Sequence, residues 1–184
     1  PSDGRGTMSI PVSVTEDALV EALGAFVQVI VGDQVAVVRG QQNRVPSPKG
    51  RYVYLTPFLA PPLSQPRTTY ADVPDAGTMT LTRPTQWTVQ VDCYGDSAQD
   101  MAVAVSIALR SAYGCDALKA SGAQPLYTGD PRQLPFSTGE HQYLERWSVD
   151  AVLQFNPSIT VPQQFADELH VDLVEVDTTY PPGA

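Results

Sequence analysis

The stretch TQWTVQVDCYGDSAQDMAVAVSIALRSA, residues 85–112, decides the fold class because it joins a clear strand pattern to a clear helix pattern. Every second residue from Trp87 to Cys93 is apolar, which is typical of one face of a β-strand. After a glycine, Ser97 and Asp100 have the spacing of a capping box. Apolar residues then recur at helical spacing to about residue 112, so a strand followed directly by an amphipathic helix is predicted.

The same patterns extend outward on both sides of this stretch. A capping box at Ser13 and Glu16 predicts an upstream helix that ends at Gly32. Alternating apolar residues predict further strands at 34–38, at 51–57, before Pro84, at 143–155 and at 168–176. Loops are expected at 40–50 and 120–139, and a stiff extended stretch over 57–66. The fold class is therefore α+β: a mostly antiparallel sheet of about four to six strands with two helices packed on one face.

The composition predicts one domain. With 184 residues, the chain is long enough for a single core, and it shows no sustained repeat. We expect a flexible N-terminal arm at 1–12, one domain at 13–177 and a flexible C-terminal tail at 178–184. The two cysteines, Cys93 and Cys115, lack metal-type spacing and are interpreted as small core residues. Neither a long apolar run nor a signal-peptide pattern is present, so the expectation is a soluble, unsecreted protein with no membrane partner.

The net charge of the chain disfavours tight binding of nucleic acid. Eleven basic residues against twenty acidic ones give a formal charge of -9, the wrong sign for binding phosphates tightly. Basic residues are concentrated between positions 39 and 67, interleaved with tyrosines, at Arg39, Arg44, Lys49, Arg51 and Arg67. This segment could be a nucleic-acid patch, or it could form one half of a charge-complementary contact between subunits. The acidity of the whole chain favours the contact.

Residues that could carry catalysis are few. The only histidines are His141 and His170, and neither belongs to a known catalytic motif. His170 and Asp172 share one face of a predicted strand, a metal-like spacing, but two ligands do not complete a metal site. We therefore expect no catalytic residues, no cofactor and no metal. The alternative function is a small acidic metal-dependent hydrolase that uses His170 and Asp172.

Four segments together resemble the phage neck/tail terminator family. The first is the loop QNRVPSPKG at 42–50 with the following strand YVYL at 52–55, similar to a QN-x-x-P-x-P-x-G loop-and-strand signature. The second, WTVQVDCYGDSA at 87–98, resembles a strand, an aromatic-Gly pair and a helix start that begins with small residues. The third, ERWSVD at 145–150, resembles a late Glu-Arg strand, and the strand near 169–176 resembles the closing one. The proline-rich segment 57–66 departs from the family pattern.

The resemblance implies a structural virion subunit and carries over no chemistry. It implies a ring, a homo-hexamer, at the head-proximal end of a phage tail that caps the tail tube and joins it to the head connector. DNA would pass through this ring without specific binding. The subunit would act in the virion neck or tail and reside in the host cytoplasm during assembly.

Two groups of residues are the predicted sites of that role. The first is the stiff loop, expected at a subunit or connector contact because a proline-stiffened loop loses little entropy on docking. Its residues are Gln42, Asn43, Arg44, Pro46, Pro48, Lys49 and Gly50. The second group is acidic and expected to face the channel, where negative charge keeps DNA from sticking. Its residues are Asp72, Asp75, Asp130 and Glu140.

Overall fold

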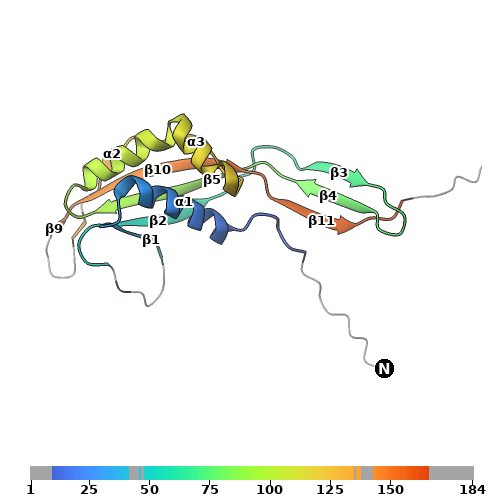
Figure 1. The fold of residues 1–184 in the computed structure, drawn as a ribbon, viewed down its shortest axis with the longest axis horizontal. Helices are drawn as coiled ribbons and strands as arrows, with labels where there is room; N and C mark the ends of the chain where they lie inside the picture. The colour runs from blue at the N-terminus through green and yellow to red at the C-terminus, as the bar shows by residue number, and fades with distance from the viewer. Residues whose placement is uncertain (1–9, 42–45, 47, 135, 138–142, 166–184) are drawn as a thin grey trace, which may run out of the picture.

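The computed structural model describes residues 10–41, 46, 48–134, 136–137 and 143–165. These residues form a helix-covered sheet and a narrower three-stranded arm that extends from one end of it (Figure 1). The helices are α1 (Glu16–Val31), α2 (Ala98–Leu109) and α3 (Ala112–Leu118), followed by a 3-10 turn at Lys119–Ser121. The α+β class is therefore confirmed, with a third helix that the sequence patterns did not predict.

The main sheet has six strands. Five follow the order β1 (Ala36–Arg39), β2 (Tyr52–Leu59), β5 (Thr85–Tyr94), β10 (Arg146–Phe155) and β6 (Gln124–Thr128), and β7 (Arg132–Gln133) also pairs with β10. All pairings are antiparallel except that of β1 with β2, which is parallel. The sheet is thus mostly antiparallel, as predicted. The exception arises because the chain between β1 and β2 returns to the starting end of β1 before β2 begins.

The arm is a second sheet in the order β11 (Ser158–Pro162), β4 (Thr78–Thr82) and β3 (Arg67–Ala71). A short hairpin of β8 (Phe136–Ser137) and β9 (Tyr143–Leu144) is the last pair of strands among the described residues. Every residue of the three arm strands is at least partly exposed. Only β4 was predicted there; β3 lies next to the stretch expected to be merely extended. The predicted strand 168–176 lies outside the described residues.

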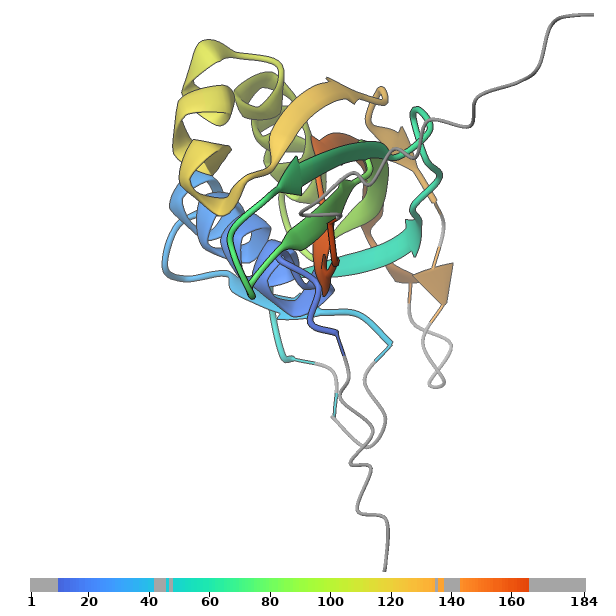
Figure 2. The same ribbon diagram turned by 90° about the vertical axis from the view of Figure 1, so that its right-hand side faces the viewer.

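The core lies between the helices and one face of the main sheet. Figure 2 shows the helices gathered on one side of the sheet. Val89, Val91 and Cys93 of β5 have no exposed surface and pack with buried residues of α1 and α2 such as Leu23 and Val105. Cys93 is therefore the small core residue that the sequence predicted, whereas Cys115 is half-buried.

Both predicted capping boxes are wrong in detail. Helix α1 is capped by Thr15, whose hydroxyl accepts a hydrogen bond from the backbone N–H of Ala18 at 3.3 Å. Ser13 instead exchanges two 2.9 Å hydrogen bonds with Ser158: its N–H donates to the carbonyl, and its hydroxyl accepts from the N–H. This pair ties the entry of α1 to the start of β11. Ser97 has a left-handed φ of 65° and makes no side-chain cap.

Helix α2 ends earlier than its apolar pattern suggests. It stops at Leu109, and Ser111 caps α3 by accepting from the N–H of Gly114 at 3.4 Å. The two helical segments Ala98–Leu109 and Ala112–Ser121 are bent by 79°. Within the described residues no single helix is long and apolar enough to cross a membrane, and only this bent pair has the length and apolar composition of a span when its two parts are taken together.

Candidate assembly interface

Three of the four sequence segments that resemble the terminator family meet at one place in the sheet. On the face away from the helices, Tyr52 of β2 lies opposite Tyr94 of β5, which lies opposite Arg146 of β10. Two residues further along β2, on the same face, Tyr54 lies opposite Asp92. We call these five residues the tyrosine cluster. They come from positions as far apart as 52 and 146, and only the strand register brings them together.

The aromatic rings of the cluster pack in close contact. The rings of Tyr52 and Tyr94 are stacked, with centroids 4.6 Å apart and planes at 16°. Tyr54 meets both edge-on, at 5.1 Å from Tyr52 and 5.7 Å from Tyr94. The guanidinium carbon of Arg146 lies 5.6 Å from the centre of the Tyr94 ring, within cation-π range. This geometry covers the sheet face with side chains where no described helix packs.

A buried ion pair holds the cluster in register. Arg146 donates to Asp92 twice, from Nη2 to Oδ2 at 2.9 Å and from Nε to Oδ1 at 3.3 Å. The side chain of Asp92 is only 6% exposed and that of Arg146 is 22% exposed. Gln90 also donates from Nε2 to both carboxylate oxygens at 2.9 Å. The carboxylate is therefore fully satisfied, which is what makes its burial tolerable.

The ionisation of these groups fits a structural role. Burial lowers the pKa of Arg146, but the hydrogen bond and the charge of Asp92 outweigh this and raise it overall. Burial and the charge of Asp92 raise the pKa of Tyr94 to about 12. Burial also raises the pKa of Tyr52. At neutral pH Tyr52 and Tyr94 are therefore neutral phenols that pack beside the ion pair of Arg146 with Asp92.

The predicted contact loop ends at the same end of the sheet as the cluster, whereas the chain enters it beside Leu55, whose carbonyl accepts from the N–H of Gly40 at 2.8 Å. Among its described residues, Pro46, Lys49 and Gly50 are exposed and Pro48 is half-exposed, whereas Gln42, Asn43 and Arg44 lie outside the described residues. The loop leads into β2 beside Gly95, where an added Cβ would lie 3.1 Å from the carbonyl oxygen of Gly50. Gly95 also has a φ of +91°, and its N–H donates to the carbonyl of Glu145 at 3.0 Å. A side chain at 95 would disturb this junction.

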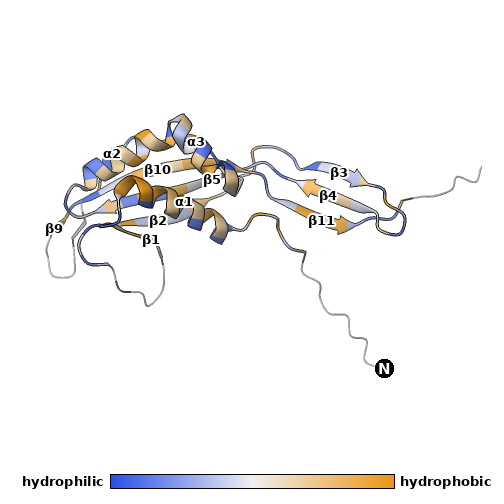
Figure 3. Ribbon diagram, viewed as in Figure 1, coloured by the Kyte–Doolittle hydropathy of each residue, from blue (hydrophilic) through white to orange (hydrophobic). Residues whose placement is uncertain are grey.

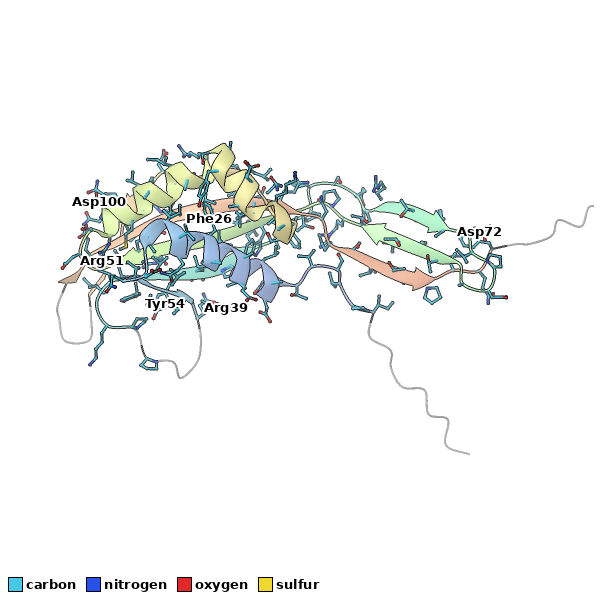
Figure 4. All side chains as sticks on the ribbon, in the orientation of Figure 1. Phe26, Arg39, Arg51, Tyr54, Asp72 and Asp100 are labelled. Atoms are coloured by element: carbon cyan, nitrogen blue, oxygen red, sulfur yellow. The ribbon has the colours of Figure 1, made fainter. Side chains whose placement is uncertain are left out.

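The predicted acidic residues do not form one group. Asp72 and Asp75 are exposed in the turn between β3 and β4 at the far end of the arm, where Figure 4 labels Asp72. They border a hollow of about 650 Å³ together with Gly77 and Phe165. Asp130 follows β6 and accepts from Arg110 Nη2 at 3.1 Å. Glu140 lies outside the described residues.

The basic residues between 39 and 67 are also dispersed. Arg39 forms ion pairs with Glu16 and Asp17 in the first turn of α1 of its own chain, which explains its position beside that helix in Figure 4. Arg67 lies in the arm, and Arg51 precedes β2. Arg39 is thus already paired within its own chain, and its expected contact with another subunit stays a prediction. Tyr52, only 5% exposed, cannot offer its ring to a base as the nucleic-acid alternative requires.

The residues of the metal-dependent alternative, His170 and Asp172, lie outside the described residues. Within the described ranges no group of three or more His, Cys, Asp or Glu side chains is placed to hold a metal ion. The tyrosine cluster was not among the sites predicted from the sequence. A sequence signal existed, because Tyr94 lies on the strand face opposite to Trp87 and Cys93, and Tyr52 and Tyr54 alternate with Val53 and Leu55.

Comparison with known proteins gives the class. The sequence pattern of the phage neck terminator protein family matches residues 17–180, nearly the whole chain. The chain therefore belongs to the phage neck terminator protein family and is a structural protein of the virion. No curated protein matches its sequence. One similar solved structure is the sheath/tube terminator, in the extended state, of PVC, an extracellular contractile injection system. It is 13% identical with a TM-score of 0.47, and the alignment covers 95% of this chain and 66% of that one.

Proposed function

We propose that copies of this chain form a closed ring at the head-proximal end of a phage tail, where the ring caps the tail tube and joins it to the head connector. The observation that carries this proposal is the family match over residues 17–180. The protein acts by contact alone and catalyses no reaction. It is assembled in the host cytoplasm and stays in the neck of the virion.

The ring contains six copies, matching the six-fold tube that members of this class are expected to cap. Head-to-tail contacts between identical subunits close only at a fixed rotation, so a single copy number is expected. Native mass spectrometry of necks released from virions tests this number, and any stoichiometry other than six contradicts the hexamer. Immunogold labelling of intact particles tests the location. Label confined to the distal tail tip would contradict the proposed neck position.

The surfaces proposed for assembly are the loop 42–50 and the rigid sheet end that supports it. The loop enters β2 beside the tyrosine cluster, whose ion pair and stacked rings give this end of the loop a rigid base. A loop that is held by a rigid attachment loses less conformational entropy when it binds a partner. We propose that Gln42, Asn43, Arg44 and Lys49 touch the neighbouring subunit or the connector, while Pro46, Pro48 and Gly50 set the shape of the loop.

A further inference from the structure

The arm has one apolar face and one polar face, as its register shows. On the apolar face, large side chains from all three strands lie in two neighbouring rows: Tyr70, Met79 and Val161 in one, and Leu81 and Ile159 in the other. The opposite face, which we call the threonine face, has a row formed by Thr69, Thr80 and Thr160. The two faces of the arm therefore differ in what they can bind.

The apolar face of the arm lies outside the helix-covered part of the molecule. Figure 3 shows the hydrophobic colouring of β4 and β11 where the arm extends beyond the helices. Tyr70 is 63% exposed, and Met79 and Leu81 are half-buried. At the tip, the ring of Phe165 meets that of Tyr70 edge-on, with centroids 6.0 Å apart. An exposed apolar surface of this kind is typical of a contact with another protein.

Helix α2 carries a second exposed apolar surface. Val103 is 38% exposed and Ile107 is 65% exposed, on the side of the helix opposite to its buried residue Val105. Asp100 is also exposed and precedes these two residues at helical spacing. We call Asp100, Val103 and Ile107 the α2 stripe. A helix whose outer side is apolar in this way can pack against a sheet face as its inner side does.

The arm and the α2 stripe of one chain cannot meet each other. Figure 4 places Asp100 near one end of the molecule, whereas Asp72 marks the arm tip at the other end. A contact between these surfaces therefore has to join two copies of the chain. Because the two surfaces differ, the contact is head-to-tail, which is the kind of contact that generates a ring when its rotation closes.

A charge lies at one end of each surface. On the arm, Arg83 comes two positions after Leu81, on the same side by strand alternation, and it is exposed at the arm base. On the α2 stripe, the charge is that of Asp100. Neither side chain forms an ion pair within the described part of the chain. Complementary charges favour the orientation in which the start of α2 lies over the base of the arm.

The spacing of the side chains fits that orientation. From Arg83 to Met79 the strand rises by about 13 Å, and from Asp100 to Ile107 the helix rises by about 10 Å. When Arg83 faces Asp100, the apolar residues of the two surfaces therefore meet in order. The resulting pairs are Leu81 with Val103 and Met79 with Ile107.

We propose that the apolar face of the arm packs on the α2 stripe of the next copy, with Arg83 paired to Asp100. This contact rests on the proposed ring and names two of the surfaces that hold it together. Three strands of five residues form a face of about 17 by 14 Å, or roughly 240 Å². Each partner of a stable complex buries about 800 Å². The contact should therefore form only together with others in the assembled ring, and the isolated chain is expected to stay monomeric.

Cysteine cross-linking in assembled particles tests the contact. In a Cys115→Ser background, Leu81→Cys with Val103→Cys should link neighbouring subunits and give a ladder of multimers of this chain on a non-reducing gel. The matched control, Thr80→Cys with Val103→Cys, places the first thiol on the threonine face. It should give at least about tenfold less ladder, since a disulfide requires close Cβ atoms. Equal ladders from both pairs, no ladder from either, or links only to another virion protein would overturn the contact.

Immunogold labelling of the same particles separates failure of this contact from failure of the ring. Label at the neck without a ladder would overturn the arm contact and leave the proposed function standing. Label confined to the distal tail tip would contradict the proposed function and the arm contact with it.

A charge exchange tests the orientation. Arg83→Glu places two acids against each other and should lower the yield of infectious particles at least about tenfold. Adding Asp100→Arg should restore the yield, whereas adding Asp116→Arg, the same change on the exposed surface of α3, should not. Circular dichroism of each purified chain checks that the variants fold. A normal yield from Arg83→Glu, rescue by both second changes or rescue by neither would overturn the pairing of Arg83 with Asp100.

Discussion

At the scale of single residues, Asp92 and Arg146 determine whether the tyrosine cluster survives. Removal of one partner from a buried ion pair leaves an uncompensated charge, which costs about 3–5 kcal/mol when the burial is complete. Asp92 is almost fully buried, while Arg146 keeps some exposure. The neighbouring pair Arg132–Asp150 has the same 2.9 Å contact but exposures of 50% and 25%, so solvent screens it.

This contrast predicts the cost of two matched substitutions. Arg146→Met should lower the free energy of unfolding by about 3 kcal/mol, because Asp92 stays buried without its cation. Arg132→Met should lower it by about 1 kcal/mol or less. Urea unfolding at pH 7 measures both values. Equal losses for the two variants would show that the buried pair has no special weight.

The buried thiol of Cys93 makes the free energy of unfolding depend on pH in the alkaline range. Burial, assisted by the charge of Asp92, raises the pKa of Cys93 from 9.0 to about 12. The unfolded thiol therefore ionises above pH 9 while the folded thiol stays neutral. The stabilisation is complete below pH 9 and is lost as the pH rises toward 12, by about 1.4 kcal/mol per pH unit for one proton.

Cys93→Ala should remove this contribution to the slope. Between pH 9 and 10.5 the free energy of unfolding of the variant should fall less steeply than that of the wild type, even though the variant is less stable at pH 8. Cys115→Ser is the control and should keep the wild-type slope. Identical slopes for the wild type and Cys93→Ala would mean that the Cys93 thiol does not titrate differently in the two states.

At the scale of elements, the sequence predicts those strands and helices that bury one face in the core, because a buried face imposes a regular spacing of apolar residues. Strand β5 was predicted because the core covers Val89 and Val91 and forces strict alternation. Strand β3 was missed because all its residues are exposed, so nothing in RTTYA imposes a pattern. The 79° break after α2 was missed because Ala112 continues the apolar spacing.

Of the candidate site, only the loop could be predicted from the sequence. The loop 40–50 is visible from its prolines and glycines, but the tyrosine cluster requires the register of three strands, which no local pattern contains. The parallel pairing of β1 with β2 was also not visible, because the loop between them permits either direction. Long-range pairing is a property of the whole sheet.

The role of the loop 42–50 in assembly can be tested by reversing its charges. Replacing Arg44 and Lys49 together by Glu should leave the monomer folded, because Lys49 is exposed, but should stop the joining of heads to tails. The measurement is the yield of infectious particles in a complementation assay, with circular dichroism of the purified monomer beside it. Lys119→Glu, an exposed charge reversal outside the loop, should leave the yield unchanged. Normal yields from the double variant would reduce the loop to a simple connector.

At the scale of the whole molecule, charge and assembly have to be reconciled. Each chain carries -9, so a ring of six would carry about -54, and its subunits repel one another unless local contacts compensate. Arg39 and Arg110 already form ion pairs within their own chain, so they contribute less to such contacts than the sequence suggested. The acids without a described ion pair, Asp72 and Asp75 among them, remain available to shape the field of the ring.

We predict that acidic residues outnumber basic ones on the channel surface, because a basic wall would bind phosphates and slow the passage of DNA. Asp72→Lys with Asp75→Lys should then convert a ring that does not bind duplex DNA into one that binds it. The variant ring should bind at least about tenfold more tightly in 50 mM than in 200 mM salt. Asp33→Lys with Asp116→Lys changes the net charge equally at other exposed positions and should have a much weaker effect. Fluorescence anisotropy with labelled duplex DNA measures both variants. Equal binding by the two variants would mean that net charge alone matters, and tight, salt-sensitive binding by the wild type would contradict an acidic channel.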